Sequence, residues 1–160
     1  MPPPMTARMM DGKAVAAQLK QSLLEQVKGS DRPPGLATVL VGEDPASHAY
    51  VRSKHRLCAE LGFQSFHHEL PSTASQSQIE DLVDSLAQDP RVHGILVQLP
   101  LPSGIDDESV LARVPLHKDV DGFHPVNIGR LGMRGREPMF VPCTPAGCMR
   151  LLEHYQVPIS

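Results

Sequence analysis

The chain has 160 residues, of which 41% are hydrophobic and 21% are charged, a composition typical of a soluble globular protein with one core. A net charge of −3 and an aromatic content of 4% argue against a nucleic-acid-binding surface, which needs basic patches and stacking rings. No apolar run approaches the roughly 20 residues of a membrane span. Cys58, Cys143 and Cys148 are an odd number of cysteines without a CxxC pair, which favours reduced thiols and a cytoplasmic protein.

Residues 1–10 are expected to form a flexible tail, because this segment is rich in proline and lacks the apolar stretch of a signal peptide. Asp11 can then act as the N-cap of a helix over residues 13–28, whose apolar residues recur every four positions and which ends at Gly29. The aliphatic segment "LATVLVG" is predicted to be a buried strand.

The segment "EDPAS" begins a second predicted helix, with Asp44 as its N-cap and Pro45 in the first turn, where a backbone N–H is not needed. Gly62 is expected to end this helix, and "FQSFHHEL" is the second predicted strand. A third helix is predicted to begin at a capping box formed by Ser75 and Gln78, and "VHGILVQLP" is predicted to be the third strand.

After the third strand we expect one short helix around "DDESVLARV", a long irregular stretch over residues 115–138, and a last helix over residues 145–156 capped by Thr144. Strands that alternate with helices predict an α/β fold in three layers, with a parallel sheet flanked by helices. Ligands of such sheets bind beyond the carboxyl ends of the strands. The segments "GEDPAS" and "QLPLP" are therefore expected to meet at one crevice.

The second predicted helix carries a lysine, Lys54, among apolar side chains. At about 100° per residue, several residues share the face of Lys54, whereas His55 is predicted to point away from it. The residues that share this face are Tyr50, Leu57, Cys58 and Leu61. One interpretation is that the lysine stem covers apolar surface while the ammonium reaches water. The other is that partial burial and a nearby cationic substrate keep the amine neutral, so that it can act as a base.

Three more side chains allow both a structural and a functional interpretation. Tyr50, one turn before Lys54, is either a half-buried core residue or a ring that stacks on a flat ligand. Gln98 interrupts an apolar strand, so its amide is either satisfied by a neighbouring loop or available to a ligand. Asp121 belongs to a turn in "KDVDGF", and its carboxylate can accept two N–H bonds from a heterocycle. The eight histidines have no recognisable metal-site spacing, so no metal is expected.

Five segments, taken in order, resemble those of the bifunctional methylenetetrahydrofolate dehydrogenase/methenyltetrahydrofolate cyclohydrolase family. They are "DGKAVAAQLK", "VGEDPASHAYVRSKHRLCAELGF", "VHGILVQLPLP", "HKDVDGFHPVNIGRL" and "PCTPAG". The resemblance runs from Asp11 to the C-terminus. It implies one-carbon metabolism on tetrahydrofolate: NADP-dependent oxidation of the 5,10-methylene form to the 5,10-methenyl form, and hydrolysis of the latter to 10-formyltetrahydrofolate. It also implies a homodimer and a link to purine biosynthesis.

The resemblance implies a role for each matching residue. Tyr50 would stack on the folate rings, Lys54 would be the base of the hydrolysis, and Gln98 would position Lys54 and the one-carbon unit. Asp121 would hold the pterin edge, and Thr144 would contact the nicotinamide. The other substrate contacts implied by the resemblance are Ser47, Val51, Arg52, Ser53, Val97, Leu99 and Pro100.

The resemblance also divides the chain. Residues 11–143 are expected to be a folate-binding catalytic domain, and residues 144–160 the start of a linker helix to an NADP-binding domain outside this sequence. Such a chain is expected to bind folate but not to support efficient hydride transfer. One alternative is a non-catalytic folate-binding or dimerisation module with the same fold. An unrelated α/β binding domain would require the order of the five segments to be accidental.

Overall fold

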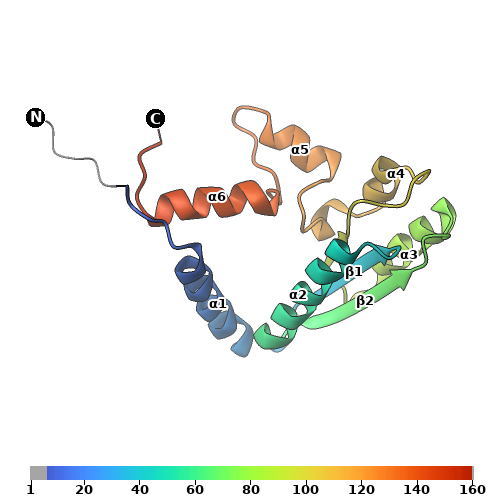
Figure 1. Cartoon of the computed structure of the whole chain (residues 1–160), viewed down its shortest axis with the longest axis horizontal. Coiled ribbons are helices and arrows are strands. Elements are labelled where there is room, and N and C mark those ends of the chain that lie inside the picture. Colours follow the sequence, from blue (N-terminus) through green and yellow to red (C-terminus); the bar gives the residue numbers. More distant parts are fainter. Residues whose placement is uncertain (1–6, 160) are drawn as a thin grey trace, which may run out of the picture.

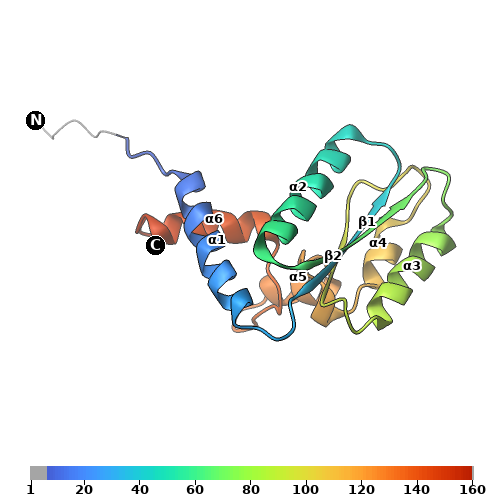
Figure 2. The ribbon, with the colours of Figure 1, turned by 90° about the horizontal axis from the view of Figure 1, so that it is seen from below.

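The computed structural model describes residues 7–159, which form three parallel strands between layers of helices (Figure 1). In chain order the elements are α1 (Gly12–Lys28), β1 (Gly35–Val41), α2 (Pro45–Leu61), β2 (Gln64–Leu70), α3 (Gln76–Gln88), β3 (Gly94–Val97), α4 (Asp107–Ala112), a 3-10 turn η1 (Leu116–Lys118), α5 (Pro125–Leu131) and α6 (Cys143–His154). The strand order is β2-β1-β3. Helix α2 covers one face of the sheet, and α3 and α4 cover the other (Figure 2). The predicted three-layer α/β fold is confirmed.

The capping residues recognised in the sequence set the helix boundaries. Asp11 and Asp44 accept hydrogen bonds from first-turn N–H groups of α1 and α2, and Gly62 ends α2 in the left-handed conformation with φ of +78°. Ser75 and Gln78 form the predicted capping box at the start of α3. These predictions are confirmed.

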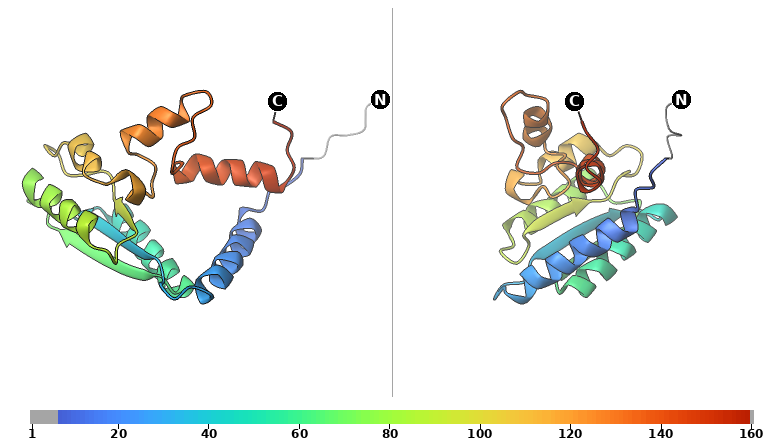
Figure 3. Two further views of the ribbon diagram at one scale, coloured as in Figure 1. Left: turned by 180° about the vertical axis from the view of Figure 1, so that it is seen from behind. Right: turned by 90° about the vertical axis from the view of Figure 1, so that its left-hand side faces the viewer.

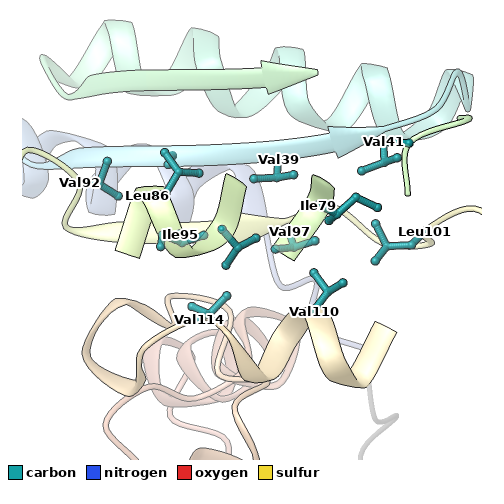
Figure 4. Packing of buried hydrophobic residues seen from close by; sticks show 13 residues of the cluster. Val39, Val41, Ile79, Leu86, Val92, Ile95, Val97, Leu101, Val110 and Val114 are labelled. Carbon is teal, nitrogen blue, oxygen red and sulfur yellow. The ribbon is translucent and has the colours of Figure 1, made fainter. Parts of the chain in front are cut away.

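The core lies mainly between the sheet, α3 and α4 (Figure 4). Alternate residues of β1 point into it, because successive side chains of a strand face opposite sides. The buried members of this cluster are Ala37, Val39, Val41, Ala74, Ile79, Val83, Leu86, Val92, Ile95, Val97, Leu101, Val110 and Val114. Burial of each large aliphatic side chain contributes about 1.5–3 kcal/mol, so this cluster fixes the carboxyl ends of β1 and β3.

Helices α1 and α6 extend away from the sheet and approach each other at their far ends (Figures 1 and 3). There the backbone N–H of Asp11 donates to the hydroxyl of Tyr155 at 2.8 Å. Helix α1 buries only Val15, and α6 buries none of its residues. Of the predicted tail, residues 7–10 have no regular secondary structure, and residues 1–6 lie outside the described part of the chain. Within residues 7–159, no helix is both long and apolar enough to cross a membrane.

The structure differs from the sequence predictions after β3. This strand stops at Val97, before prolines that cannot donate to a ladder. The stretch expected to be irregular contains η1 and α5, whose first turn is capped by the side chain of His124. Two glycines inside and after α5 hide it from pattern analysis. Helix α6 begins at Cys143, so Thr144 lies inside the helix and does not cap it.

Candidate active site

A cavity of about 620 Å³ opens beyond the end of β3, between α2 and the start of α6. Its walls come from four segments that are distant in the sequence. The lining residues are Tyr50, Lys54, Val97, Gln98, Leu99, Asp121, Phe123, Pro142, Cys143, Thr144 and Pro145. The predicted crevice is present only in part: Gln98 and Leu99 of "QLPLP" line the cavity, whereas no residue of "GEDPAS" does. The cavity combines a cation, a carboxylate, an amide and an aromatic ring in one concave site.

Helix α2 places two of these side chains through its spacing. Its buried face is Ser47, Val51, Cys58 and Leu61. Tyr50 is 64% exposed, so its interpretation as a half-buried core residue is wrong. Leu57, predicted to share the face of Lys54, is 44% exposed. The sheet contacts α2 along Val51 and Cys58, which turns Tyr50 and Lys54 to the border of that face. Residues four apart lie on the same side of a helix, so Tyr50 and Lys54 reach the cavity together.

His55, which was predicted to point away from the face of Lys54, contacts the sheet. His55 is half-buried; its Nε2 lies 3.1 Å from the Thr38 hydroxyl, and its Nδ1 hydrogen bonds with the hydroxyl of Ser65. The Thr38 hydroxyl also contacts His67 Nδ1 at 3.0 Å. Burial lowers the pKa of His55, the neighbouring His67 lowers it further, and Glu69 opposes both effects. This network ties α2 to β1 and β2 on the face of the sheet opposite the main core.

Lys54 and Asp121 provide the opposing charges of the cavity. Burial raises the pKa of the Asp121 carboxyl, the positive charge of Lys54 lowers it, and Asp119 raises it again. Within residues 7–159, the Lys54 side chain has no hydrogen bond or ion pair at contact distance, so its amino group remains available to a ligand. The sequence shows no acid within one helical turn of Lys54; the acid comes instead from the segment that follows η1.

Gln98 lies at the end of β3 and lines the cavity while its amide is partly satisfied. Its Nε2 donates to the carbonyl oxygen of Leu99 at 2.7 Å. The next peptide bond, Leu99–Pro100, is cis. The loop interpretation and the ligand interpretation of Gln98 are thus compatible, because a local bond to one amide proton orients the side chain at the cavity wall.

Some expected substrate contacts lie outside the cavity lining. Ser47 and Val51 are 4% and 1% exposed on the buried face of α2. Arg52 and Ser53 lie on the exposed side of the same helix, and Pro100 is exposed after β3. None of these five residues lines the cavity with Lys54. For the four on α2 the reason is helical spacing, because residues four apart share a side of the helix.

Other lining residues were not predicted from the sequence. They are Phe123, Pro142, Cys143 and Pro145. Their positions in the sequence could have identified them, because each lies within two residues of Asp121 or Thr144. Burial raises the pKa of the Cys143 thiol, Asp121 raises it further, and Lys54 lowers it. Cys143 is therefore a protonated wall residue and a poor nucleophile at neutral pH.

Comparison with known proteins identifies the family. Residues 10–121 match the sequence model described as tetrahydrofolate dehydrogenase/cyclohydrolase, catalytic domain. The chain belongs to this family. The bifunctional protein FolD of Moorella thermoacetica is 51% identical over 152 residues, which cover 93% of this chain and 54% of that protein. The bifunctional protein FolD 2 of Arabidopsis thaliana is 48% identical over 159 residues, covering 97% and 53% of the two chains.

Solved structures of this family have the same fold. The methylenetetrahydrofolate dehydrogenase-cyclohydrolase of Trypanosoma brucei, solved with NADP cofactor and inhibitor, superposes with a TM-score of 0.89 at 39% identity over 94% of this chain and 52% of that one. FolD of Campylobacter jejuni gives a TM-score of 0.86 at 42% identity over 94% and 54%. The chain spans about half the length of the relatives it matches.

Proposed function

We propose that this chain binds a tetrahydrofolate derivative and hydrolyses 5,10-methenyltetrahydrofolate to 10-formyltetrahydrofolate. We further propose that it is the folate-binding part of a bifunctional enzyme that also oxidises 5,10-methylenetetrahydrofolate with NADP. One observation carries the proposal: Tyr50, Lys54, Gln98 and Asp121 line a single cavity at the ligand-binding edge of a parallel sheet. Residues 11–143 are the proposed folate-binding catalytic domain.

Tyr50 and Asp121 are suited to bind the flat pterin. The Tyr50 ring is 64% exposed and reaches the cavity, so one face is available for stacking. Asp121 is half-buried, and burial raises its pKa. Ligand N–H groups that donate to this carboxylate would restore the hydrogen bonds lost with water, and they would favour its ionised form.

Lys54 is the proposed base of the hydrolysis. A methenyl cation beside Lys54 disfavours a second positive charge, and this repulsion favours the neutral amine that the hydrolysis needs. It takes a proton from the water that attacks the methenyl carbon, and the new C–O bond neutralises the cation. The resulting ammonium then gives its proton to the ring nitrogen as the C–N bond breaks. The hydroxyl proton of the adduct is released to water as the C=O bond forms, which leaves a neutral formyl group on the other nitrogen. Gln98 would hold the amine and the one-carbon unit in register.

The described residues fit NADP only in part. Thr144 lines the cavity and would contact the nicotinamide. The turn from β1 to α2 contains Glu43 and Asp44, and Asp44 already accepts the first-turn N–H of Ser47 at 2.7 Å. A turn with these carboxylates does not fit a pyrophosphate, which binds glycine-rich turns with unoccupied N–H groups. When bound, NADP supplies hydride chemistry; the residues described here would bind and orient the folate for it.

A cytoplasmic homodimer that supplies one-carbon units for purine biosynthesis is also proposed. The family resemblance supports this, as do three cysteines without a disulfide. Strand β2 lies at one edge of the sheet and is mostly exposed, so it is one surface on which a second copy could pair. Sedimentation velocity at micromolar concentration tests the dimer, and a purely monomeric species would contradict it.

The decisive test follows the loss of methenyltetrahydrofolate absorbance, with and without NADP, for the wild-type chain and for Lys54→Met. General acid–base catalysis contributes about 10²–10⁴-fold, so Lys54→Met should lose at least about 100-fold in turnover. Arg56→Met is the matched control, since Arg56 is an exposed cation of the same helix that does not line the cavity. Wild-type turnover by Lys54→Met would refute the assigned base. Folate binding without turnover in the wild-type chain would favour the non-catalytic module.

A further inference from the structure

We propose that Asp119 and Asn127 are positioning residues for folate binding. They form a buried carboxylate–amide pair that holds two walls of the cavity at a fixed separation. Neither residue lines the cavity. One wall is the loop that carries Asp121, and the other is the segment that leads into α6. The inference rests on the proposed function of this cavity, and it assigns a task to two polar side chains buried beside it.

Asp119 organises the first wall. Its side chain is buried, with 4% exposure, yet it accepts three hydrogen bonds. One carboxylate oxygen accepts from the N–H of Phe123 at 3.1 Å, and the other accepts from the N–H of His124 at 2.8 Å and from Asn127 Nδ2 at 2.7 Å. The chain is thereby wrapped around one carboxylate, with Asp121 inside the loop that this wrapping closes.

Asn127 extends the arrangement to the second wall. It is fully buried, and its Oδ1 accepts from the N–H groups of Met139 at 2.8 Å and Phe140 at 3.3 Å. Both ends of one amide are therefore used: the nitrogen on Asp119 and the oxygen on residues 139–140. These residues precede Pro142, the first residue of the second wall that lines the cavity.

The two walls also contact each other without intervening side chains. Gly122 has φ of +71°, and a Cβ at this position would lie 2.8 Å from the backbone nitrogen of Pro142. On the same side, the Sγ of Cys143 lies 3.8 Å from the carbonyl oxygen of Val120, where it can donate a weak hydrogen bond. The two segments therefore lie side by side, and the Asp119–Asn127 pair is hydrogen-bonded to both of them.

The pair is anchored to the rigid part of the fold. Asp119 forms a parallel bridge with Ile95 of β3, which is 1% exposed in the core. Loss of one partner from a fully satisfied buried network leaves the other groups without compensation, so the loop would relax. Asp121 and Thr144 would then shift, whereas Lys54 and Gln98 sit on α2 and at the end of β3 and would stay.

This division predicts a split between kinetic constants. Asp119→Asn and Asn127→Leu should raise KM for methenyltetrahydrofolate about tenfold and leave kcat within about twofold. A purely structural role would lower kcat by reducing the folded fraction and would leave KM unchanged, and that result would overturn the inference. Asp81→Asn, at an exposed position of α3, is the matched control. In an Asp121→Asn background, Asp119→Asn should add less than twofold to KM, since both changes act on the same contact.

A second measurement needs no folate. The alkylation rates of Cys143 and Cys148 are compared by peptide mass spectrometry; both thiols are exposed and both lie on α6. We expect Cys143 to react several-fold faster in Asp119→Asn and Asn127→Leu, with Cys148 unchanged. Asn127→Ser, a milder change, serves if the leucine variant does not fold. If Cys143 is labelled faster in the variants but the chain binds no folate, the proposed function is refuted, whereas the role of Asp119 and Asn127 in holding the two walls together stands. Unchanged labelling with unchanged KM would overturn the inference.

Discussion

Lys118 is the buried lysine of this protein, and replacing it by methionine tests how the region beside the site is held. It is 7% exposed, and its Nζ donates to the carbonyl oxygens of Leu86 at 3.3 Å, Ala87 at 2.7 Å and Asp89 at 3.0 Å. These carbonyls form the C-terminal end of α3. A cation at that end complements the helix dipole as well as the individual oxygens.

The loss of stability expected for Lys118→Met depends on which of the three carbonyl oxygens have a second hydrogen-bond donor. The Leu86 oxygen also accepts from the N–H of Asp89, and the Asp89 oxygen accepts from the N–H of Val92 at 3.1 Å. Within residues 7–159, only the Ala87 oxygen depends on Lys118 alone. One unsatisfied buried carbonyl costs about 1–3 kcal/mol, and loss of the helix-end charge costs about 0.3–1 kcal/mol. Relief of ammonium desolvation offsets part of this, so we expect a net loss of about 2 kcal/mol in the free energy of unfolding.

Urea denaturation followed by circular dichroism measures this loss. With a slope of about 2 kcal/mol per molar, the midpoint should fall by about 1 M. Lys20→Met is the matched control: Lys20 forms an exposed ion pair with Glu60, and such pairs contribute about 0.2–1 kcal/mol. A midpoint for Lys118→Met equal to that of the wild type would refute the account of this lysine as the donor that satisfies the end of α3.

Three further outcomes follow from the site and its surroundings. The pKa of Asp121 is raised on folding, so its contribution to stability is present below pH 3.8 and is lost as pH rises through the folded-state pKa. Asp121→Asn should therefore have a higher melting temperature than the wild type at pH 7 and the same melting temperature below pH 3.8. Differential scanning calorimetry at both pH values measures this difference. The pKa of His55 is lowered on folding, so its contribution to stability is present above pH 6.5 and is lost as pH falls through the folded-state pKa. The melting temperature of His55→Asn should therefore fall less than that of the wild type as the pH is lowered from 7 through the folded-state pKa. Tyr50→Leu should weaken folate binding about tenfold, as measured by titration calorimetry, because stacking on an aromatic ring contributes about 1–3 kcal/mol. The same change should leave the melting temperature unchanged, because the Tyr50 ring is largely exposed.

The sequence predicts those parts of the fold in which a residue type is favoured at one particular position of a helix. Asp44, Pro45 and Gly62 mark both ends of α2 because a side-chain cap, a missing N–H and a left-handed φ each belong to one position of a helix. Helix α5 has no comparable marks. Its cap is a histidine, His124, and its glycines are typical of loops, so only the packing around the buried Asn127 identifies it.

The site was predictable in part, for a different reason. Topology places the ends of strands together, and the resemblance names Lys54, Gln98 and Asp121, but neither shows which lysine is buried. Periodicity on α2 drew attention to Lys54, whereas the lysine withdrawn from water is Lys118. Lys118 lies in a short turn without periodicity, and its partners are backbone carbonyls of a distant helix, which leave no mark in its own neighbourhood.

The motif "KDVDG" shows why a short charged run can be specific to one fold. Lys118 satisfies the end of α3, Asp119 satisfies the start of α5 and Asn127, and Asp121 faces the cavity. The three charges lie within four residues, yet each is directed to a different element. A change in their spacing would therefore misplace two helix ends as well as one carboxylate of the cavity. A run of exposed charges would tolerate such changes, whereas the spacing of these charges is tied to the packing of α3, β3 and α5 as well as to the cavity.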